Sequence, residues 1–140
     1  PVGGTYYVQS GTLNADVVVL SIVSGLVVDT LLILNNYRDR EQDARSGKRT
    51  LVVRFGERFG RNLYLGSGIF AVLFCLWFVN TGSLTLIEFI WAPCVYSYLH
   101  MLTWRKMVTI RSGKKLNSIL GETSRNMLFM GLLLSVALAN

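Results

Sequence analysis

Two carboxylates, Asp39 and Asp43, stand four residues apart directly after a long apolar run. On an α-helix this spacing places them one turn apart, separated by about 40° around the axis. If the helix continues from the apolar run, Asp29, Asn35 and Asn36 share an arc of about 120° with them. Carboxylate and amide oxygens are ligands that Mg²⁺ prefers, commonly together with substrate phosphate. We therefore interpret Asp39 and Asp43 as candidate magnesium ligands.

Basic residues follow directly after the two carboxylates, and a bound diphosphate group would need their positive charge. Carboxylates alone repel a diphosphate, whereas bridging Mg²⁺ ions remove that repulsion and stabilise the charge on a departing oxygen. Arg45, Lys48 and Arg49 are candidate contacts for the outer phosphate oxygens, and Gly47 lets the backbone turn between them. The alternative is an ordinary solvated helix end, where Asp and Arg alternate as ion pairs. An isolated DxxxD spacing also arises often by chance.

The elements that position this motif are apolar segments. A helix that crosses a bilayer needs about 20 mainly apolar residues. Four segments approach this length, at about 17–37, 63–79, 84–104 and 120–140. The first carries Asp29 as its only charge, and a short polar turn at 80–83 joins the second and third into a predicted helical hairpin. The pattern predicts an all-α integral membrane protein in which residues 1–140 belong to one domain.

The basic residues are segregated along the chain. All 14 Lys and Arg residues fall within 38–61 and 105–125, and none lies in the turn at 80–83. Cytoplasmic loops collect Lys and Arg, so the loops at about 38–62 and 105–119 are predicted to be cytoplasmic. Topology and anionic lipid headgroups account for the net charge of +6. We therefore expect the lipid bilayer as a partner and no nucleic acid.

The stretch Leu34–Gly56 follows the pattern NNxRDxxxDxxxGKxTLxVRxG. This long pattern resembles the second aspartate-rich region of the UbiA superfamily of aromatic prenyltransferases. Within the superfamily it is most similar to the branch that acts on 1,4-dihydroxy-2-naphthoate. The opening Gly3–Tyr7 and the later Leu116–Thr123 also resemble that branch, so the likeness extends over most of the chain.

The resemblance implies a fold of nine transmembrane helices around a cavity open to lipid, of which this chain would supply the last four. Two facing aspartate-rich motifs would bind a polyprenyl diphosphate through Mg²⁺. Ionisation would give an allylic cation, which the ring of 1,4-dihydroxy-2-naphthoate attacks with loss of its carboxylate as CO₂. The product would be demethylmenaquinone, formed during menaquinone biosynthesis at the cytoplasmic face of the bacterial inner membrane.

The same resemblance assigns roles to seven residues. Asp39 and Asp43 would be the catalytic, magnesium-binding pair. The substrate or diphosphate contacts would be Asn35, Asn36, Arg45, Lys48 and Arg49.

The first aspartate-rich motif of the superfamily has no counterpart in this chain, which begins with Pro1 rather than Met. We therefore expect a fragment that is inactive alone and needs the missing N-terminal helices of the same enzyme. The second basic stretch, at 105–125, either covers the cytoplasmic opening of the cavity or only sets the orientation of the helices in the membrane. We interpret His100 as a membrane-interface residue, and Asp29 as either a cavity-facing or a structural carboxylate.

Three other functions fit part of the sequence. A UbiA-type enzyme that acts on another aromatic acceptor, such as 4-hydroxybenzoate or a porphyrin-derived ring, would carry the same motif. A transporter or structural membrane subunit would explain the spans and the charge bias, but it leaves the pattern at 35–50 as a coincidence. A soluble helical prenyl synthase also uses aspartate-rich motifs, and the apolar spans exclude it.

Overall fold

A computed structural model describes residues 2–139, and within that range the chain is helical without strands. The all-α class predicted from the sequence is confirmed. The elements are α1 (Val2–Ser10), α2 (Ala15–Arg45), α3 (Leu51–Phe55), α4 (Glu57–Asn80), α5 (Leu86–Phe89), the π-helical segment η1 (Ile90–Cys94), α6 (Val95–Ile110) and α7 (Leu116–Leu138).

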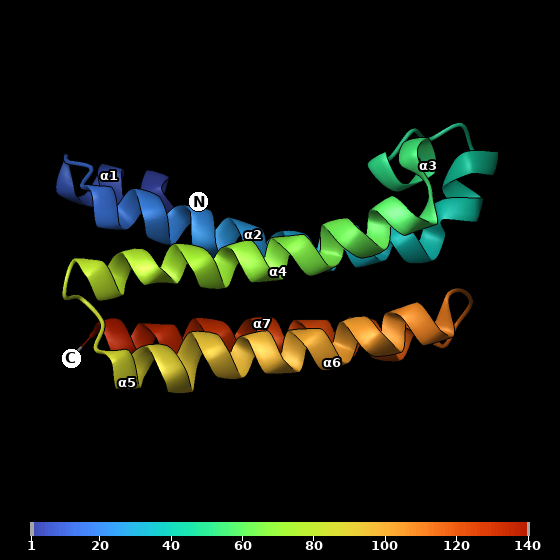
Figure 1. Cartoon of the computed structure of the whole chain (residues 1–140). Helices are drawn as coiled ribbons and strands as arrows, with labels where there is room; N and C mark the ends of the chain where they lie inside the picture. The colour runs from blue at the N-terminus through green and yellow to red at the C-terminus, as the bar shows by residue number, and fades with distance from the viewer. Residues whose placement is uncertain (1, 140) are drawn as a thin grey trace.

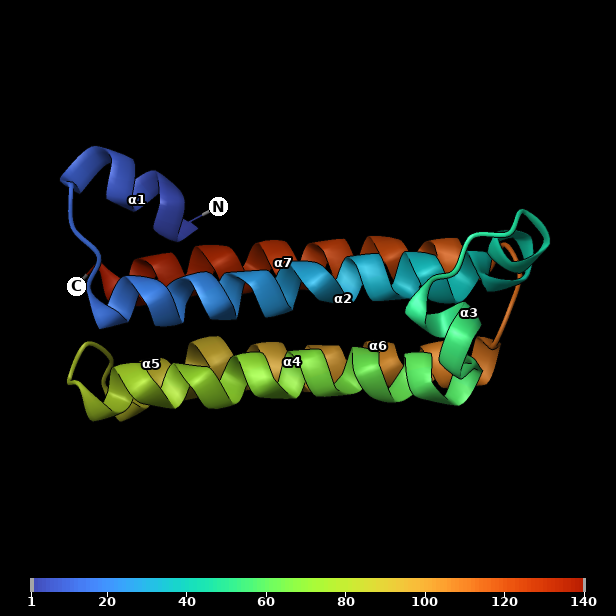
Figure 2. The same cartoon turned by 90° about the horizontal axis from the view of Figure 1, so that it is seen from above.

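The four long helices α2, α4, α6 and α7 run side by side as a bundle (Figure 1). Helix α2 contacts α4 and α7, α4 contacts α6, and α6 contacts α7, so the four helices enclose a common core. The C-terminal end of α2, helix α3 and the α6–α7 connection gather at one end of the bundle, and the α4–α5 turn lies at the other (Figure 2). The motif at 35–50 and the loop at 111–115 therefore share one end, as the charge pattern predicts.

Two described helices, α2 and α4, are long and apolar enough to cross a membrane. The helices also extend past the predicted spans, because α2 continues to Arg45 and α7 begins at Leu116. The third apolar run is helical from Leu86 to Ile110, with the π-helical segment around Pro93. Proline has no N–H to donate and so disturbs the regular ladder, which accounts for the π-helical turn.

The interior of the bundle has two apolar clusters. The cluster nearer the α4–α5 turn contains Val23, Val27, Ala71, Cys75, Phe78, Leu84, Tyr96, Met130, Leu134 and Ala137. The cluster nearer the motif contains Ile33, Leu34, Tyr37, Val52, Tyr64, Met107, Leu116 and Ile119. Burying these side chains stabilises the bundle and holds the end of α2 against α3, α4 and α7.

A buried polar layer separates the two clusters along every helix. Its members are Thr30, Ser67, His100, Thr103, Thr123 and Asn126. Tyr64 and Thr123 share a hydrogen bond of 2.9 Å, and the Asn126 amide donates one of 2.9 Å to Thr103 Oγ1. Because polar groups buried among apolar neighbours need partners, these bonds fix which helices lie opposite each other.

Candidate metal and diphosphate site

Helix α2 carries the aspartate motif on its last turns. The helix continues unbroken from the apolar run to Arg45, so Asp39 and Asp43 lie one turn apart on the same helix. Asn35 and Asn36 are half-buried one turn earlier. Asp29 is exposed on the surface of the described chain and lies ten residues before Asp39, about 15 Å away along the axis. The structure therefore does not bring Asp29 to the motif.

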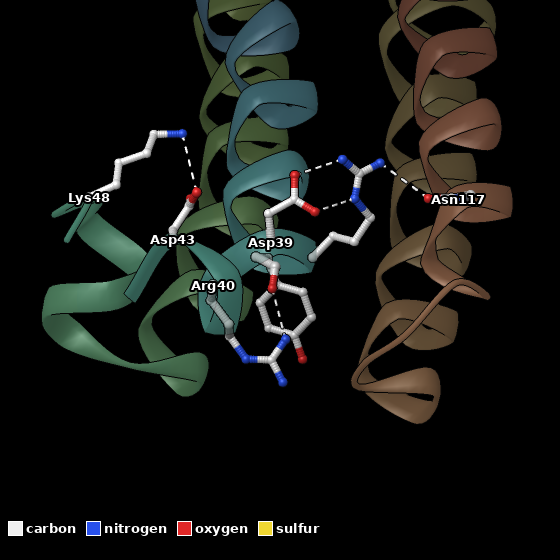
Figure 3. Close-up of polar contacts among 7 residues, drawn as sticks. Asp39, Arg40, Asp43, Lys48 and Asn117 are labelled. Atoms are coloured by element: carbon white, nitrogen blue, oxygen red, sulfur yellow. Dashed lines mark hydrogen bonds and ion pairs between the residues drawn. The ribbon is translucent and has the colours of Figure 1, made fainter. Parts of the chain in front are cut away.

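The carboxylate of Asp39 is held by its sequence neighbour. Arg38 donates from Nε to Oδ1 and from Nη2 to Oδ2, both at 2.7 Å. The Nη1 atom of Arg38 donates at 3.1 Å to Oδ1 of Asn117 in the first turns of α7 (Figure 3). These hydrogen bonds from Arg38 hold the pKa of Asp39 below its ordinary value. Asp39 is therefore ionised at neutral pH and bonded on both oxygens.

Asp43 is in a different environment from Asp39. The residue is only 8% exposed, and its Oδ1 lies 3.4 Å from Nζ of Lys48. Its Oδ2 is buried and finds no hydrogen-bond partner among residues 2–139. The turn that returns Lys48 to Asp43 depends on Gly47, whose φ of +78° is unfavourable for other residues. The backbone N–H of Lys48 donates to the Asp43 carbonyl at 2.9 Å and closes this turn.

A groove runs between the end of α2 and the α6–α7 connection. Its lining includes Arg38, Asp39, Arg45, Gly113 and Lys114. The predicted diphosphate contact Arg45 therefore lines the same groove as Asp39, whereas Lys48 lies at Asp43. Arg49 is exposed after the turn and is not part of this lining. The structure thus divides the predicted cations between the two carboxylates.

A hydrogen-bond and ion-pair network that no sequence pattern indicates fixes the end of α2 against the start of α4. Tyr37 is fully buried and donates a hydrogen bond of 2.9 Å to Glu57 Oε1. Arg61 donates to the Tyr37 hydroxyl at 3.0 Å and forms an ion pair with Glu57. Arg40 lies over the Tyr37 ring and 3.7 Å from Glu57. No local spacing connects residue 37 with residues 57 and 61, so only the packing of α2 on α4 reveals the network.

The two carboxylates differ in what they offer Mg²⁺: Asp43 has an oxygen without a partner in the described chain, whereas Asp39 is already bound by Arg38. The unpartnered Oδ2 of Asp43 is an available hard ligand. Both oxygens of Asp39 accept a hydrogen bond from Arg38, so a metal ion at Asp39 would compete with that guanidinium. Within residues 2–139 no group of three or more His, Cys, Asp or Glu side chains is placed to hold a metal. The described residues can therefore supply two carboxylates.

His100 lies in the bundle interior, and the prediction of a membrane-interface position is wrong. Its ring stacks on Tyr64 and Tyr96, and its Nε2 lies 3.1 Å from the Tyr64 carbonyl oxygen. The space for the ring comes from Gly68 on α4, which has no side chain to fill it. Sequence alone placed this residue close to the loop, and the packing of α6 on α4 places it in the core.

This chain is similar to known proteins over nearly its whole length. A model described as the UbiA prenyltransferase family matches residues 1–137. A Haemophilus influenzae protein named 1,4-dihydroxy-2-naphthoate octaprenyltransferase is 48% identical over 60 residues, which are 43% of this chain and 20% of that protein. Proteins of the same name from Mycobacterium tuberculosis and Mycobacterium leprae are 32% and 31% identical. Those alignments cover 97% and 96% of this chain, and 45% and 44% of the two mycobacterial proteins.

The chain therefore spans less than half the length of these curated relatives. No solved structure matches it. The family match covers nearly the whole chain, including the aspartate motif on α2 and the start of α7 that faces it. This chain belongs to the UbiA prenyltransferase family.

Proposed function

We propose that this chain is the C-terminal part of an integral membrane prenyltransferase. The complete enzyme transfers a polyprenyl group from a polyprenyl diphosphate to 1,4-dihydroxy-2-naphthoate, with loss of CO₂, and forms demethylmenaquinone. The chain supplies the last four helices of a nine-helix bundle and one of two magnesium-binding motifs. By itself it is inactive, because the facing motif belongs to the N-terminal helices.

The observation that carries this proposal is the pair of carboxylates on successive turns at the end of α2, with Arg45 in the groove that Asp39 lines and Lys48 3.4 Å from Asp43. Mg²⁺ held by Asp39 and Asp43 would supply electrostatic stabilisation of the departing diphosphate. Arg45, Lys48 and Arg49 would bind its outer oxygens, and Asn35 and Asn36 would contact substrate where α2 leaves the apolar core. The buried Oδ2 of Asp43 supports a ligand role.

The acceptor assignment rests on the relatives that share this region, which are named as 1,4-dihydroxy-2-naphthoate octaprenyltransferases. The same motif would serve a family member that prenylates 4-hydroxybenzoate. The gathering of the motif and the α6–α7 connection at one end of the bundle supports a site at one face of the membrane. The excess of Lys and Arg in the loops at this end supports a position on the cytoplasmic side, and the membrane we propose is the bacterial inner membrane.

The test uses membranes that contain the full-length enzyme, with a polyprenyl diphosphate, 1,4-dihydroxy-2-naphthoate and Mg²⁺. The double variant Asp39→Ala, Asp43→Ala is expected to lose activity by about a hundredfold or more, because metal stabilisation of the leaving group is worth several kcal/mol. Asp16→Ala is the matched control, since it removes a carboxylate from the other end of α2, where Asp16 accepts a hydrogen bond from Trp77.

Full activity in the double variant would refute the assigned site. Activity that survives complete chelation of divalent cations would refute the magnesium requirement. Prenylation of 4-hydroxybenzoate alone would leave the reaction class standing and overturn the proposed acceptor. Transport without prenyl transfer would favour the membrane-transporter alternative.

A further inference from the structure

The side chain of Arg38, on α2, contacts one residue of its own helix and one of α7. Its guanidinium uses Nε and Nη2 on the two oxygens of Asp39, each at 2.7 Å, and Nη1 on Oδ1 of Asn117 at 3.1 Å. In Figure 3, dashed lines join the labelled Asp39 on α2 and Asn117 on α7 to one guanidinium, which these hydrogen bonds identify as that of Arg38. The side chain is only 28% exposed, although it belongs to a charged helix end. This residue was not among the site residues expected from the sequence.

The position of Asn117 is set by the tight connection between α6 and α7. Arg111 has a φ of +60° and Gly113 a φ of +88°, both in the left-handed region. Helix α7 begins at Leu116, whose side chain is fully buried in the motif-end cluster. The buried Leu116 thereby fixes the neighbouring Asn117 against the end of α2. Arg38, Asp39, Gly113, Lys114 and Asn117 together line one groove.

We propose that Arg38 is a diphosphate-binding residue that occupies the Asp39 carboxylate until the metal–diphosphate complex arrives, with Asn117 as the residue that positions it. The inference rests on the proposed function, because it requires Mg²⁺ and a diphosphate at this site. Mg²⁺ on Asp39 and the two hydrogen bonds from Arg38 would use the same two oxygens, and two cations on one carboxylate repel each other, so they compete for Asp39. Displaced from Asp39, the guanidinium stays at the groove through Asn117 and turns its Nε and Nη2 to phosphate oxygens.

The chemistry of arginine permits this exchange, in which the guanidinium leaves the Asp39 carboxylate and binds phosphate oxygens. Its planar fork of N–H groups matches a carboxylate and a phosphate equally well, and both are bound through two parallel hydrogen bonds. A lysine retains the positive charge and lacks the fork. The exchange also keeps the charges at the end of α2 paired at every stage. Asp39 faces Arg38 before binding and Mg²⁺ afterwards, whereas Arg38 faces first a carboxylate and then a phosphate.

Two binding measurements on the purified full-length enzyme test the exchange, and neither measures turnover. The first is titration with Mn²⁺ alone, followed by electron paramagnetic resonance of the free ion. The charge-conserving variant Arg38→Lys is expected to bind Mn²⁺ about fivefold more tightly than wild type, because the bidentate competitor for Asp39 is lost. Arg58→Lys, at an exposed arginine in the first turn of α4, is the matched control and is expected to leave the affinity unchanged.

The second measurement is calorimetric binding of inorganic pyrophosphate at saturating Mg²⁺. Here the same Arg38→Lys variant is expected to bind about fivefold more weakly, since two charge-assisted hydrogen bonds to phosphate become one. Asn117→Ala is expected to weaken pyrophosphate binding about threefold while it leaves Mn²⁺ affinity unchanged, because Arg38 keeps its contact with Asp39 but loses its anchor. The exchange predicts that Arg38→Lys changes the affinities for Mn²⁺ and for pyrophosphate in opposite directions.

If Arg38 had only a structural role, Arg38→Lys would weaken the binding of both Mn²⁺ and pyrophosphate, or of neither. Either result overturns the inference. Unchanged pyrophosphate binding in Asn117→Ala overturns the positioning role. If wild type binds Mn²⁺ and Asp39→Asn abolishes it while Arg38→Lys changes nothing, this inference fails and the proposed function stands. If wild type binds Mn²⁺ neither alone nor with pyrophosphate, the magnesium site fails, and the exchange fails with it.

Discussion

Gly68 on α4 and His100 on α6 occupy one shared space in the bundle core. A Cβ atom placed on Gly68 would lie 2.3 Å from Nε2 of His100, well inside van der Waals contact. The ring also stacks on Tyr64 at a centroid distance of 4.6 Å and lies 3.1 Å from the carbonyl oxygen of that residue. The absence of a side chain at residue 68 therefore sets how closely α6 approaches α4 in the polar layer.

Gly68→Ala is expected to destabilise the folded enzyme by about 1–3 kcal/mol, the usual cost of an added methyl group in a packed core. The ring of His100 is stacked on both sides and has little room to move. Thermal unfolding of the detergent-solubilised full-length enzyme measures the effect. Gly66→Ala on the same helix meets no atom within 4 Å in the described structure and is the matched control. Equal unfolding temperatures for the two variants would contradict the packing argument.

Tyr64 and Thr123 should be energetically coupled across α4 and α7, because their hydroxyl groups share a buried hydrogen bond of 2.9 Å. In a double-mutant cycle of Tyr64→Phe and Thr123→Val, we expect a coupling free energy of about 0.5–1.5 kcal/mol, as for hydrogen bonds between membrane helices. Denaturant unfolding in mixed micelles provides the four stabilities. Additive effects of the two substitutions would show that the bond contributes nothing to the helix pairing.

Lys48→Gln is expected to raise the KM for polyprenyl diphosphate about five- to tenfold, since the lysine is proposed to bind the phosphate oxygens. The free energy of unfolding should change by no more than about 1 kcal/mol, because the Lys48 side chain is 62% exposed and solvent screens its 3.4 Å contact with the buried Asp43. Steady-state kinetics on membranes measures the KM. Lys106→Gln breaks an ion pair of similar exposure with Glu122 and should leave the KM as in wild type. The same rise in KM for both variants would indicate a general charge effect.

Glu57→Ala is expected to destabilise the enzyme by about 1–3 kcal/mol and to lower kcat/KM. Its carboxylate accepts from the buried Tyr37 hydroxyl and pairs with Arg61 and Arg40, so its loss leaves that hydroxyl without its acceptor and two arginines without their carboxylate. Tyr37 lies two residues before Asp39, so the loosened contact displaces the aspartate motif. Differential scanning fluorimetry together with initial rates checks both effects.

The control for Glu57→Ala is Glu41→Ala, which removes a carboxylate that is 71% exposed and 4.0 Å from Arg40. Its unfolding temperature is expected to stay within about 1 °C of wild type, since surface ion pairs contribute little. A Glu57→Ala enzyme as stable as Glu41→Ala would show that the network around Tyr37 does not hold α2 on α4.

The sequence predicted those features of this protein that depend on neighbours along the chain. Apolar runs and the placement of Lys and Arg are local quantities, and they predicted helices with the basic stretches at one end, as the fold has them. The four-residue spacing of Asp39 and Asp43 predicted one shared helical face, and the unbroken α2 places them there. The turn at Gly47 was also predicted, because a positive φ is a property of a single residue.

The partners of these residues depend on how the helices pack, which no local pattern encodes. The stripe from Asp29 to Asp43 was expected to act as one oxygen-rich site, yet Asp29 is exposed in the described chain while Asp43 is buried beside Lys48. The approach of α7 brings Asn117 to Arg38, and the approach of α4 brings Glu57 to Tyr37. His100 entered the core because Gly68 left room for it on another helix. Burial and hydrogen bonding between distant segments arise only when the bundle closes, and they determine which side chains can reach a metal ion or a diphosphate.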